Sequence, residues 1–528
     1  MTDRKSTIEI LDTTLRDGAQ SEKLAFAVKD KINIIHALDR VGVTVIEAGN
    51  PGASPKDMEL FAAMRGVPLK NARLAAFTPT RRKTNTAEED PMLAAAVACG
   101  APIVCVFGKS SRSHAEKVLG VSEEENLAMI ADSIRFLRAS GLEVYFDAEH
   151  YFDGYREDAA YALATVRTAF AAGAKQIVLC DTNGGTLPSE VATIVAETIA
   201  ATAAPVGIHC HNDAGLAVAC SMSAVEAGAT HVQGTFLGFG ERCGNTCLST
   251  LIPNLQLKLG YTVVSEESLR NFTKEARRIA DAADQDLNRE LPYVGRSAFA
   301  HKAGMHVDAH LKLRGAYEHV DPTAVGNTRR LPVSEFSGNQ TLVAKFARLF
   351  PEVGRNAPEL ARVREALKAN EAEGYQYESA EESLELLIRR EVGSMREFYE
   401  LIDCKLIDQL PVRIGASASA VVKIRVGDSF ELAVAEGAGP VHAIDQALRT
   451  ALSRFYPALK NVSLTAYKVR VLTPRNATAA KVLVLIRSTD GETEWSTVGV
   501  SADIIKASYY ALRDSIEYKL INDSERGL

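Results

Sequence analysis

The chain has 528 residues, 46% of them hydrophobic, and this length allows two to four domains that each have a core. Its 60 basic and 67 acidic residues give a formal charge of −7 without a long block of one sign. This distribution argues against nucleic acid and membranes as partners and leaves small molecules and other proteins.

From residue 8 to residue 260, one pattern recurs: a short apolar run, a polar or glycine-bearing turn, and a longer stretch with helical spacing. Strands that alternate with helices pair in parallel, and eight such units in about 250 residues predict a (β/α)8 barrel. An open doubly wound sheet is the alternative, but it would gather the polar residues at one crossing point, whereas here they follow run after run. The strand-like runs are IEILDTT (from residue 8), VTVIEAG (43), RLAAFTP (73), PIVCVFG (102), EVYFDAE (143), QIVLCDT (176), PVGIHCH (205) and HVQGTFL (231).

The rest of the chain changes character twice. A charged helical stretch and an irregular segment are followed, from residue 326 to residue 400, by mainly helical patterns. From about residue 401, strand-like and helical runs are typical of an α+β module. We therefore expect an α/β protein with a TIM barrel over residues 1–265, a mainly helical linker over 266–400 and an α+β domain over 401–528.

The stretch GIHCHNDAG, residues 207–215, ends the seventh strand-like run with two imidazoles. Residues i and i+2 of a strand point to the same side, so His209 and His211 can reach one metal ion. The alternative is one hydrogen-bonded core histidine and one histidine at the surface. The position favours the metal, because active sites of barrels lie where the strands end.

Two imidazoles do not complete the ligand shell of a divalent cation, so oxygen ligands are expected from neighbouring strand ends. The first run ends in LDTTLRDG, which offers Asp12, Arg16 and Asp17, and closure of the barrel brings strand one near strand seven. The loop after the eighth run adds Asn245. Mixed nitrogen and oxygen ligands with open positions form a Lewis-acid site for an oxygen-bearing substrate.

The motifs LDTTLRDGAQ, GIHCHNDAG and GERCGN, at the ends of runs one, seven and eight, resemble those of the metal-dependent Claisen synthases and lyases that share a DTTLRDG-type barrel. That family contains 2-isopropylmalate, homocitrate and citramalate synthases and, more distantly, hydroxymethylglutaryl-CoA lyase and pyruvate carboxylase. The resemblance implies a divalent metal ion (Mn²⁺, Mg²⁺, Co²⁺ or Zn²⁺) bound by Asp17, His209 and His211, with Asn245 in or beside the ligand shell. It also implies that Arg16 faces the negative charge that develops on a 2-oxo acid, although an ion pair with Asp17 is the structural alternative.

The resemblance extends to the residues around the organic substrates. Glu149, in YFDAEHYFDG, matches an acidic residue beside the methyl group of the co-substrate acetyl-CoA, with a salt bridge at the barrel rim as the alternative. Thr182, in CDTNGGTLP, matches a hydroxyl that binds the 2-oxo acid carboxylate, with a helix cap as the alternative. Gln20 is a further candidate for the same pocket.

Beyond the barrel, SAFAHKAGMHVDAH resembles the family's AFAHSSGIHQDG stretch, which enters the active site of the neighbouring subunit. The match puts His306 at the catalytic histidine, Tyr317 near its partner tyrosine, and His301 in a structural or peripheral position. The resemblance therefore implies a homodimer with shared active sites.

Within the family, FDAEHYFDGY, DTNGGTLP and GNPGASPKD resemble the longer citramalate synthases, although Asn50 stands where that branch more often has a bulky residue. This branch implies condensation of acetyl-CoA with pyruvate to (R)-citramalate in isoleucine synthesis. The alternatives are 2-isopropylmalate or homocitrate synthesis and, outside enzymes, an inactive barrel that senses an amino acid. The C-terminal region resembles the family's regulatory dimer domain, which implies isoleucine or leucine as an allosteric effector.

The eight cysteines lie mostly within apolar segments, such as IVLCDTN, where a thiol behaves as a small hydrophobic side chain. Cys243 and Cys247 do not indicate a zinc knuckle, because no second pair of suitable ligands lies nearby. The start of the chain lacks the pattern of a signal peptide, and no uncharged run approaches the ~20 residues that span a bilayer. These features predict a cytoplasmic protein.

Overall fold

A computed structural model of the chain contains two compact units, one formed by residues 1–299 and 318–329 and the other by residues 300–317 and 330–528. The structure describes residues 6–301, 305–306, 309, 312–313, 315–330, 342–343, 345–346, 349–351, 357–408, 417–472, 480–491 and 493–526.

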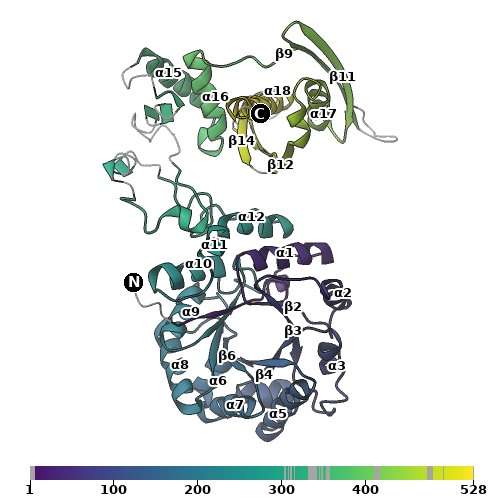
Figure 1. The fold of residues 1–528 in the computed structure, drawn as a ribbon, viewed down its shortest axis with the longest axis vertical. Helices are drawn as coiled ribbons and strands as arrows, with labels where there is room; N and C mark the ends of the chain where they lie inside the picture. Colours follow the sequence, from purple (N-terminus) through teal and green to yellow (C-terminus); the bar gives the residue numbers. More distant parts are fainter. Residues whose placement is uncertain are drawn as a thin grey trace. The chain divides into compact units, whose positions relative to one another are not determined.

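The first unit is a closed barrel of parallel strands (Figure 1). Its eight strands follow one another in sequential order, and β1 pairs with both β2 and β8. All eight predicted runs form strands, so the barrel is confirmed and the open sheet is excluded. The strands are β1 (Glu9–Asp12), β2 (Val45–Gly49), β3 (Arg73–Pro79), β4 (Ile103–Lys109), β5 (Glu143–Glu149), β6 (Gln176–Asp181), β7 (Val206–Cys210) and β8 (His231–Gly234).

Helices follow the strands and surround the barrel (Figure 1). The signals at their ends are typical: α5 begins after Ser122, whose hydroxyl accepts a hydrogen bond from the Glu125 amide at 3.3 Å. The turn after α7 uses Gly173 at φ 101°, a conformation that is costly for residues with a Cβ atom. The helices are α1 (Val28–Arg40), α2 (Pro55–Met64), α3 (Pro91–Ala98), α4 (Arg112–His114), α5 (Glu123–Ala139), α6 (Tyr151–Glu157), α7 (Ala159–Ala171), α8 (Pro188–Thr202), α9 (Ala217–Glu226), α10 (Leu248–Pro253), α11 (Glu266–Arg270) and α12 (Phe272–Ala282), with short helical turns at Gly18–Gln20, Ala115–Leu119, Asn254–Lys258 and Pro322–Val325.

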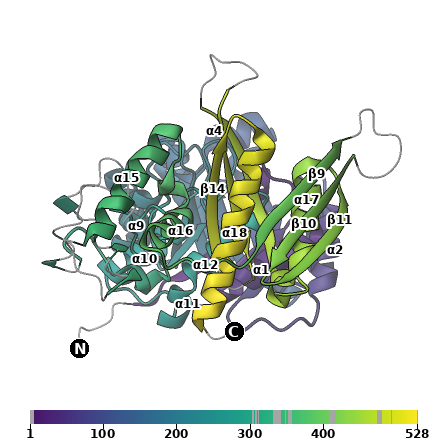
Figure 2. The same ribbon diagram turned by 90° about the horizontal axis from the view of Figure 1, so that it is seen from above.

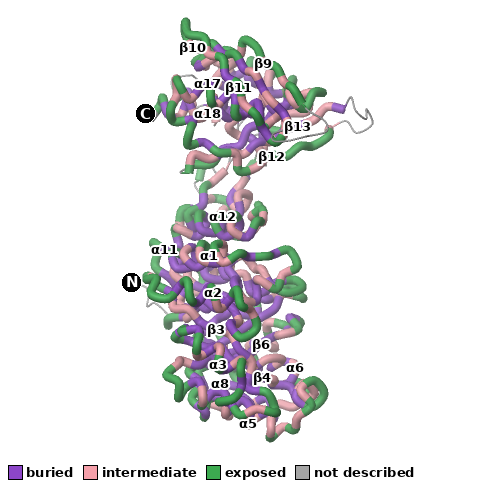
Figure 3. Tube along the Cα trace, turned by 90° about the vertical axis from the view of Figure 1, so that its right-hand side faces the viewer, coloured by how far each residue is buried: buried purple, intermediate pink, exposed green. Residues whose placement is uncertain are grey.

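The barrel has an outer core between strands and helices and a smaller core inside the ring of strands. Buried residues concentrate along the strands (Figure 3). Because the inner core is packed with side chains, it forms a floor beneath the C-terminal strand ends rather than a channel. The inner core consists of Leu11, Val45, Ala75, Ile103, Cys105 and Tyr145.

The N-terminal end of the barrel interior holds a polar cluster formed by Glu9, Tyr145 and His231. The Glu9 carboxylate accepts hydrogen bonds from the Tyr145 hydroxyl, 3.2 and 3.1 Å from its two oxygens, and lies 2.8 Å from His231 Nδ1. Burial opposes the Glu9 charge, but its bonds to His231 lower the pKa of the carboxyl. Both carboxylate oxygens therefore have partners within the protein.

The second unit contains two successive groups of three antiparallel strands and a helix. The first sheet has the order β11-β10-β9 and the second β12-β13-β14. Helix α17 lies against β10 and β11, and α18 lies against β13 and β14 (Figure 2). These elements are β9 (Glu400–Asp408), β10 (Ala418–Val426), β11 (Ser429–Gly437), α17 (Pro440–Leu452), β12 (Ser463–Val471), β13 (Val482–Thr489), β14 (Glu494–Ser501) and α18 (Ile504–Arg526), with a helical turn at Pro457–Asn461.

Two helices from the predicted linker, α15 (Pro358–Glu373) and α16 (Glu381–Val392), pack together and share a core with the second sheet; a helical turn at Tyr377–Ser379 precedes α16. The Ser383 hydroxyl of α16 donates to Asp514 of α18 at 2.9 Å. The α+β content expected after residue 401 is confirmed, and the helices before it form part of the same compact unit. Among the described residues, none of the helices has the length and apolar character needed to cross a membrane.

Candidate metal centre and active site

A cavity of about 220 Å³ opens among the C-terminal ends of the barrel strands. Most of its lining is polar, and two stacked aromatic rings form the main apolar part. The lining residues are Arg16, Asp17, Gln20, Phe77, Phe107, Asp147, Glu149, Cys180, Thr182, His209, His211, Gln233, Glu241 and Arg242.

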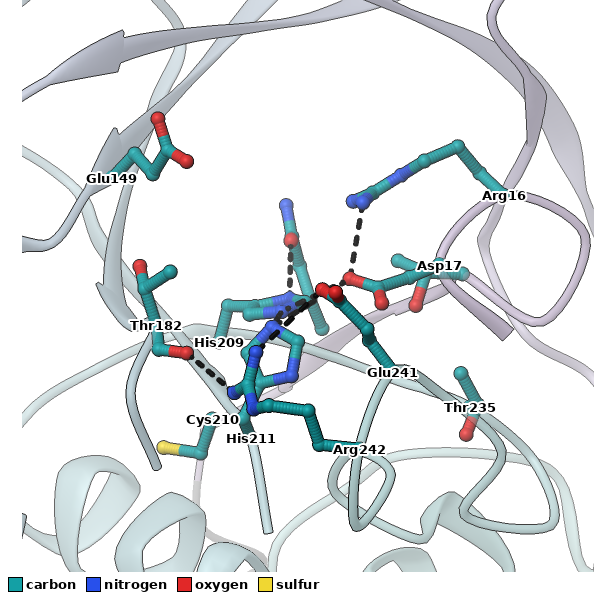
Figure 4. Close-up of polar contacts among 12 residues, drawn as sticks. Arg16, Asp17, Glu149, Thr182, His209, Cys210, His211, Thr235, Glu241 and Arg242 are labelled. Atoms are coloured by element: carbon teal, nitrogen blue, oxygen red, sulfur yellow. Dashed lines mark hydrogen bonds and ion pairs between the residues drawn. The ribbon is translucent and has the colours of Figure 1, made fainter. Parts of the chain in front are cut away.

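Three donor atoms converge at this cavity. Asp17 Oδ2 lies 3.4 Å from His209 Nε2 and 3.9 Å from His211 Nε2, and the two imidazole nitrogens are 3.4 Å apart. Figure 4 shows the three side chains pointing toward one another, while Cys210 points away from them. All three residues are buried, and their donor atoms lie within 4.8 Å of one another, a spacing that could hold a metal ion.

The charges of this group suit a cation. Burial opposes ionisation of Asp17, but the Arg16 guanidinium holds the pKa of its carboxyl well below the usual range. Burial and the neighbouring His209 lower the pKa of His211 to about 4. An ionised carboxylate beside a neutral imidazole is the protonation state that metal binding requires.

Asn245 lies beside this group, because its backbone forms a bridge with that of His211. Its side chain is buried, and neither its Oδ1 nor its Nδ2 has a hydrogen-bond partner within the described part of the chain. Gly240 leaves the room for it, since a Cβ atom there would stand 2.3 Å from Asn245 Oδ1. A buried amide without a partner costs about 1–3 kcal/mol, so a ligand at this position would satisfy an otherwise unfavourable group.

Arg16 is fixed on three sides. Its Nε donates to Glu47 at 2.5 Å, its Nη1 lies 3.0 Å from Asp17 Oδ2, and its guanidinium carbon lies 3.9 Å from the centre of the Phe77 ring. Burial disfavours the charge, but Glu47 and Asp17 raise the pKa of Arg16. The predicted ion pair with Asp17 is therefore present, and the guanidinium also lines the cavity.

Glu149, Thr182 and Gln20 also line the cavity. Figure 4 shows the first two. Glu149 forms an ion pair with Lys109 at the end of β4, which is the rim salt bridge given as its alternative. The Thr182 hydroxyl accepts a hydrogen bond from the His150 amide at 2.8 Å rather than from the start of α8. Gln20 is the last residue of the short helical turn Gly18–Gln20, which begins directly after Asp17.

His306 and Tyr317 belong to the second compact unit, where their rings stack with centres 4.0 Å apart. Tyr317 is half exposed. The His301 amide donates to the Arg330 carbonyl at 2.9 Å, and the residue is buried. Other residues of the predicted SAFAHKAGMHVDAH segment, namely 302–304, 307, 308 and 310, lie outside the described residues.

Four further residues complete the site and were not predicted. Glu47, Asp147 and Gln233 are polar residues within strands, and their buried side chains lie in the barrel interior. Arg242 joins three strand ends, since it donates to the Thr182 carbonyl at 2.7 Å and to both Asp213 carboxylate oxygens at 2.7 and 2.9 Å. A polar residue in an otherwise apolar strand was the available signal for the first three.

The chain matches three families in succession. Residues 7–276 match the HMGL-like family, residues 293–374 the homocitrate synthase post-HMGL domain-like family, and residues 378–520 the LeuA allosteric (dimerisation) domain.

Relatives that match along nearly the whole chain identify a narrower family. The chain is 45% identical to the (R)-citramalate synthase of Aquifex aeolicus (strain VF5), over 99% of both chains. It is 46% identical to the (R)-citramalate synthase of Synechocystis sp., over 98% of this chain and 97% of the relative. The chain belongs to the (R)-citramalate synthase family. The 2-isopropylmalate synthase of Methanocaldococcus jannaschii is more distant, at 29% identity over 96% of this chain and 94% of the relative.

Membership of this family confirms the predicted resemblance and the prediction that the chain is an acyl-transferring synthase. The family match agrees with the fold, because the HMGL-like segment covers the barrel with its candidate metal donors.

Proposed function

We propose that the protein condenses acetyl-CoA with pyruvate and hydrolyses the thioester, releasing (R)-citramalate and CoA for isoleucine synthesis in the cytoplasm. The observation that carries this proposal is the convergence of Asp17, His209 and His211 beside Arg16 in one cavity. The names of the relatives that match along the full length support the choice of product.

We assign Asp17, His209 and His211 as ligands of a divalent cation, with Asn245 as a fourth donor or its immediate neighbour. The donor set fits such an ion, because Asp17 Oδ1 and Asn245 Oδ1 are buried oxygens without hydrogen-bond partners among the described residues. Mn²⁺, Mg²⁺, Co²⁺ or Zn²⁺ in this position would supply Lewis-acid polarisation of the keto group.

Arg16 would stabilise the negative charge that develops on the keto oxygen during carbon–carbon bond formation. Its contacts with Glu47, Asp17 and the Phe77 ring hold the guanidinium before substrate arrives, so little reorganisation is needed during the reaction. Thr182, with Gln20 nearby, would bind the substrate carboxylate from another side of the cavity.

The reaction needs a base that removes a proton from the acetyl methyl group before that carbon attacks the keto carbon. We assign this role to Glu149, which lines the cavity and forms an ion pair with Lys109. His306 and Tyr317 of a partner subunit would then move protons at the alkoxide and at the water that hydrolyses the thioester.

The apolar part of the cavity supports a small 2-oxo acid. Phe77 and Phe107 stack with ring centres 4.9 Å apart, and both line the cavity beside Arg16. These two rigid rings leave limited room next to the guanidinium for a substrate side chain.

A comparison of pyruvate, 2-oxoisovalerate and 2-oxoglutarate by kcat/KM tests the substrate, with release of the CoA thiol as the measurement. We expect pyruvate to be preferred. A clear preference for 2-oxoisovalerate would favour 2-isopropylmalate synthesis, and absence of turnover with any of them would favour the amino-acid sensor.

We further propose a homodimer with shared active sites, supported by the match of residues 378–520 to a dimerisation domain. Neither His306→Ala nor Arg16→Ala alone should be active. Mixing and reassociating the two inactive proteins should restore part of the activity, because some mixed dimers contain one intact site. No recovery in mixtures shown to exchange subunits would contradict this arrangement.

The same match, to an allosteric domain, supports feedback by isoleucine or leucine. Isoleucine should reduce kcat/KM for pyruvate, whereas a chain truncated before residue 378, if it folds, should not respond. Equal activity of the full chain with and without either amino acid would contradict the assignment.

A further inference from the structure

Three buried side chains form a hydrogen-bonded series, or hydrogen-bonded chain, behind the candidate metal centre. It begins at Asp147 of β5, passes through Gln233 of β8 and ends at His209 of β7. Gln233 Nε2 donates to Asp147 Oδ1 at 2.8 Å, and Gln233 Oε1 lies 3.0 Å from His209 Nδ1. Gln233 is completely buried and the other two residues nearly so.

The hydrogen bonds fix the direction of this chain. A carboxamide has one donor end and one acceptor end, and the donor end of Gln233 faces Asp147. Its oxygen must therefore face His209 Nδ1, and an oxygen can only accept, so Nδ1 carries the proton. The unprotonated nitrogen of the ring is then Nε2, which lies 3.4 Å from both Asp17 Oδ2 and His211 Nε2.

His211 provides an internal comparison. Its Nδ1 is buried and has no hydrogen-bond partner within the described residues. The two imidazoles that converge on one point therefore differ at Nδ1: that of His209 is bonded to Gln233, whereas that of His211 has no bonded partner among the described residues.

We infer that Gln233, anchored by Asp147, is a positioning residue that sets the tautomer and ring orientation of His209 and so raises the affinity of the site for a divalent cation. This inference rests on the proposed function, because it assumes that His209 is a metal ligand. Removal of the hydrogen-bond partner of a metal-binding imidazole typically lowers the metal affinity by about 10–100-fold.

A polar chain inside a barrel can also serve stability alone, so the test needs a matched control. Tyr145→Phe is suitable, because Tyr145 lies on the same face of β5 as Asp147, two residues earlier, and its hydroxyl bonds to Glu9 at the other end of the barrel. Gln233→Met removes both hydrogen bonds with little change in volume. Gln233→Glu keeps an oxygen that can accept the proton of His209 Nδ1.

The experiment measures Mn²⁺ binding to the metal-free full-length protein by calorimetry, together with the melting temperature of each variant without metal. We expect Gln233→Met to weaken Mn²⁺ binding at least tenfold, Gln233→Glu to recover most of that loss, and Tyr145→Phe to bind like the parent even where its melting temperature falls.

Equal Mn²⁺ affinity of Gln233→Met and the parent would overturn the inference, as would an equal loss in Tyr145→Phe. If Gln233→Met does not fold, Asp147→Asn replaces it, with a smaller expected loss because an asparagine oxygen can still accept from Gln233; unchanged affinity in that variant would also count against the inference. A parent protein that binds no divalent cation would instead refute the metal site of the proposed function.

Discussion

The two ends of the barrel interior differ in how their carboxylates are hydrogen-bonded. At the N-terminal end, both oxygens of Glu9 accept hydrogen bonds from neighbouring side chains. At the C-terminal end, Asp17 Oδ1 and the amide of Asn245 are buried without partners among the described residues. Since an unpartnered buried polar atom costs about 1–3 kcal/mol, the first cluster serves stability and the second retains bonding capacity for a ligand.

Removing the carboxylate at the C-terminal end should have the largest effect. Asp17→Ala removes a charged donor from the site, and His209→Ala should act similarly. We expect Mn²⁺ binding to be lost and kcat/KM to fall by at least about a thousandfold. Glu9→Gln, at the other end, is the control and should keep both within about twofold. Full activity of Asp17→Ala in metal-free buffer would refute the role of the site.

The second-largest effect is expected from removing and restoring the metal ion. The melting temperature should respond to Mn²⁺ only in proteins whose C-terminal site is intact. A ligand that binds only the folded state at 100 times its Kd stabilises it by about 2.7 kcal/mol. Addition of Mn²⁺ to chelator-treated protein should therefore raise the melting temperature of the parent and of Glu9→Gln equally, but not that of Asp17→Ala. An equal rise in all three proteins would place the bound ion elsewhere.

A change in the aromatic part of the cavity lining, Phe77 and Phe107, should alter the selectivity between 2-oxo acids rather than metal binding. Phe77→Leu makes room beside Arg16, so we expect the ratio of kcat/KM for 2-oxoisovalerate to that for pyruvate to rise about tenfold. Phe272→Leu removes the same atoms from a buried ring of α12 that does not line the cavity. If Phe272→Leu changes this ratio as much as Phe77→Leu does, Phe77 does not determine the selectivity between the two substrates.

The smallest effect is expected from the pH dependence of the N-terminal cluster. Because the pKa of Glu9 is lowered in the folded state, its contribution is present above its ordinary value of 4.5 and is lost as the pH falls further. Glu9→Gln should reduce the free energy of unfolding by about 1–2 kcal/mol at neutral pH. In chemical denaturation, this difference from the parent should shrink below pH 4.5, and a difference that grows there would contradict the assignment.

The sequence predicted the barrel strands well because each is a short apolar run followed by a turn and a helix. Strand β9 lacks this pattern, since Asp403 and Lys405 interrupt its apolar residues and much of it is exposed at a sheet edge. Edge strands carry a weaker hydrophobic alternation than central ones, so their sequences resemble loops.

The residues at the strand ends were also predictable, whereas those that hold them were not. Asp17, His209 and His211 occur with apolar runs in recognisable motifs. Gln233 and Asp147, by contrast, lie within two different strands and are 86 residues apart along the chain. Their contact depends on the size of the closed ring and on which residues of each strand face inward. Neither quantity can be read from one strand alone.

Closure of the ring bears on when the proposed metal site can form. Asp17 follows the first strand, and the two histidines lie at the end of the seventh. The eighth strand must insert between these two strands before the donors meet. A nascent chain that has not yet been synthesised past residue 234 would expose isolated donors with little affinity. With the proposed metal site, selection among cellular cations would thereby be deferred until the polypeptide has folded.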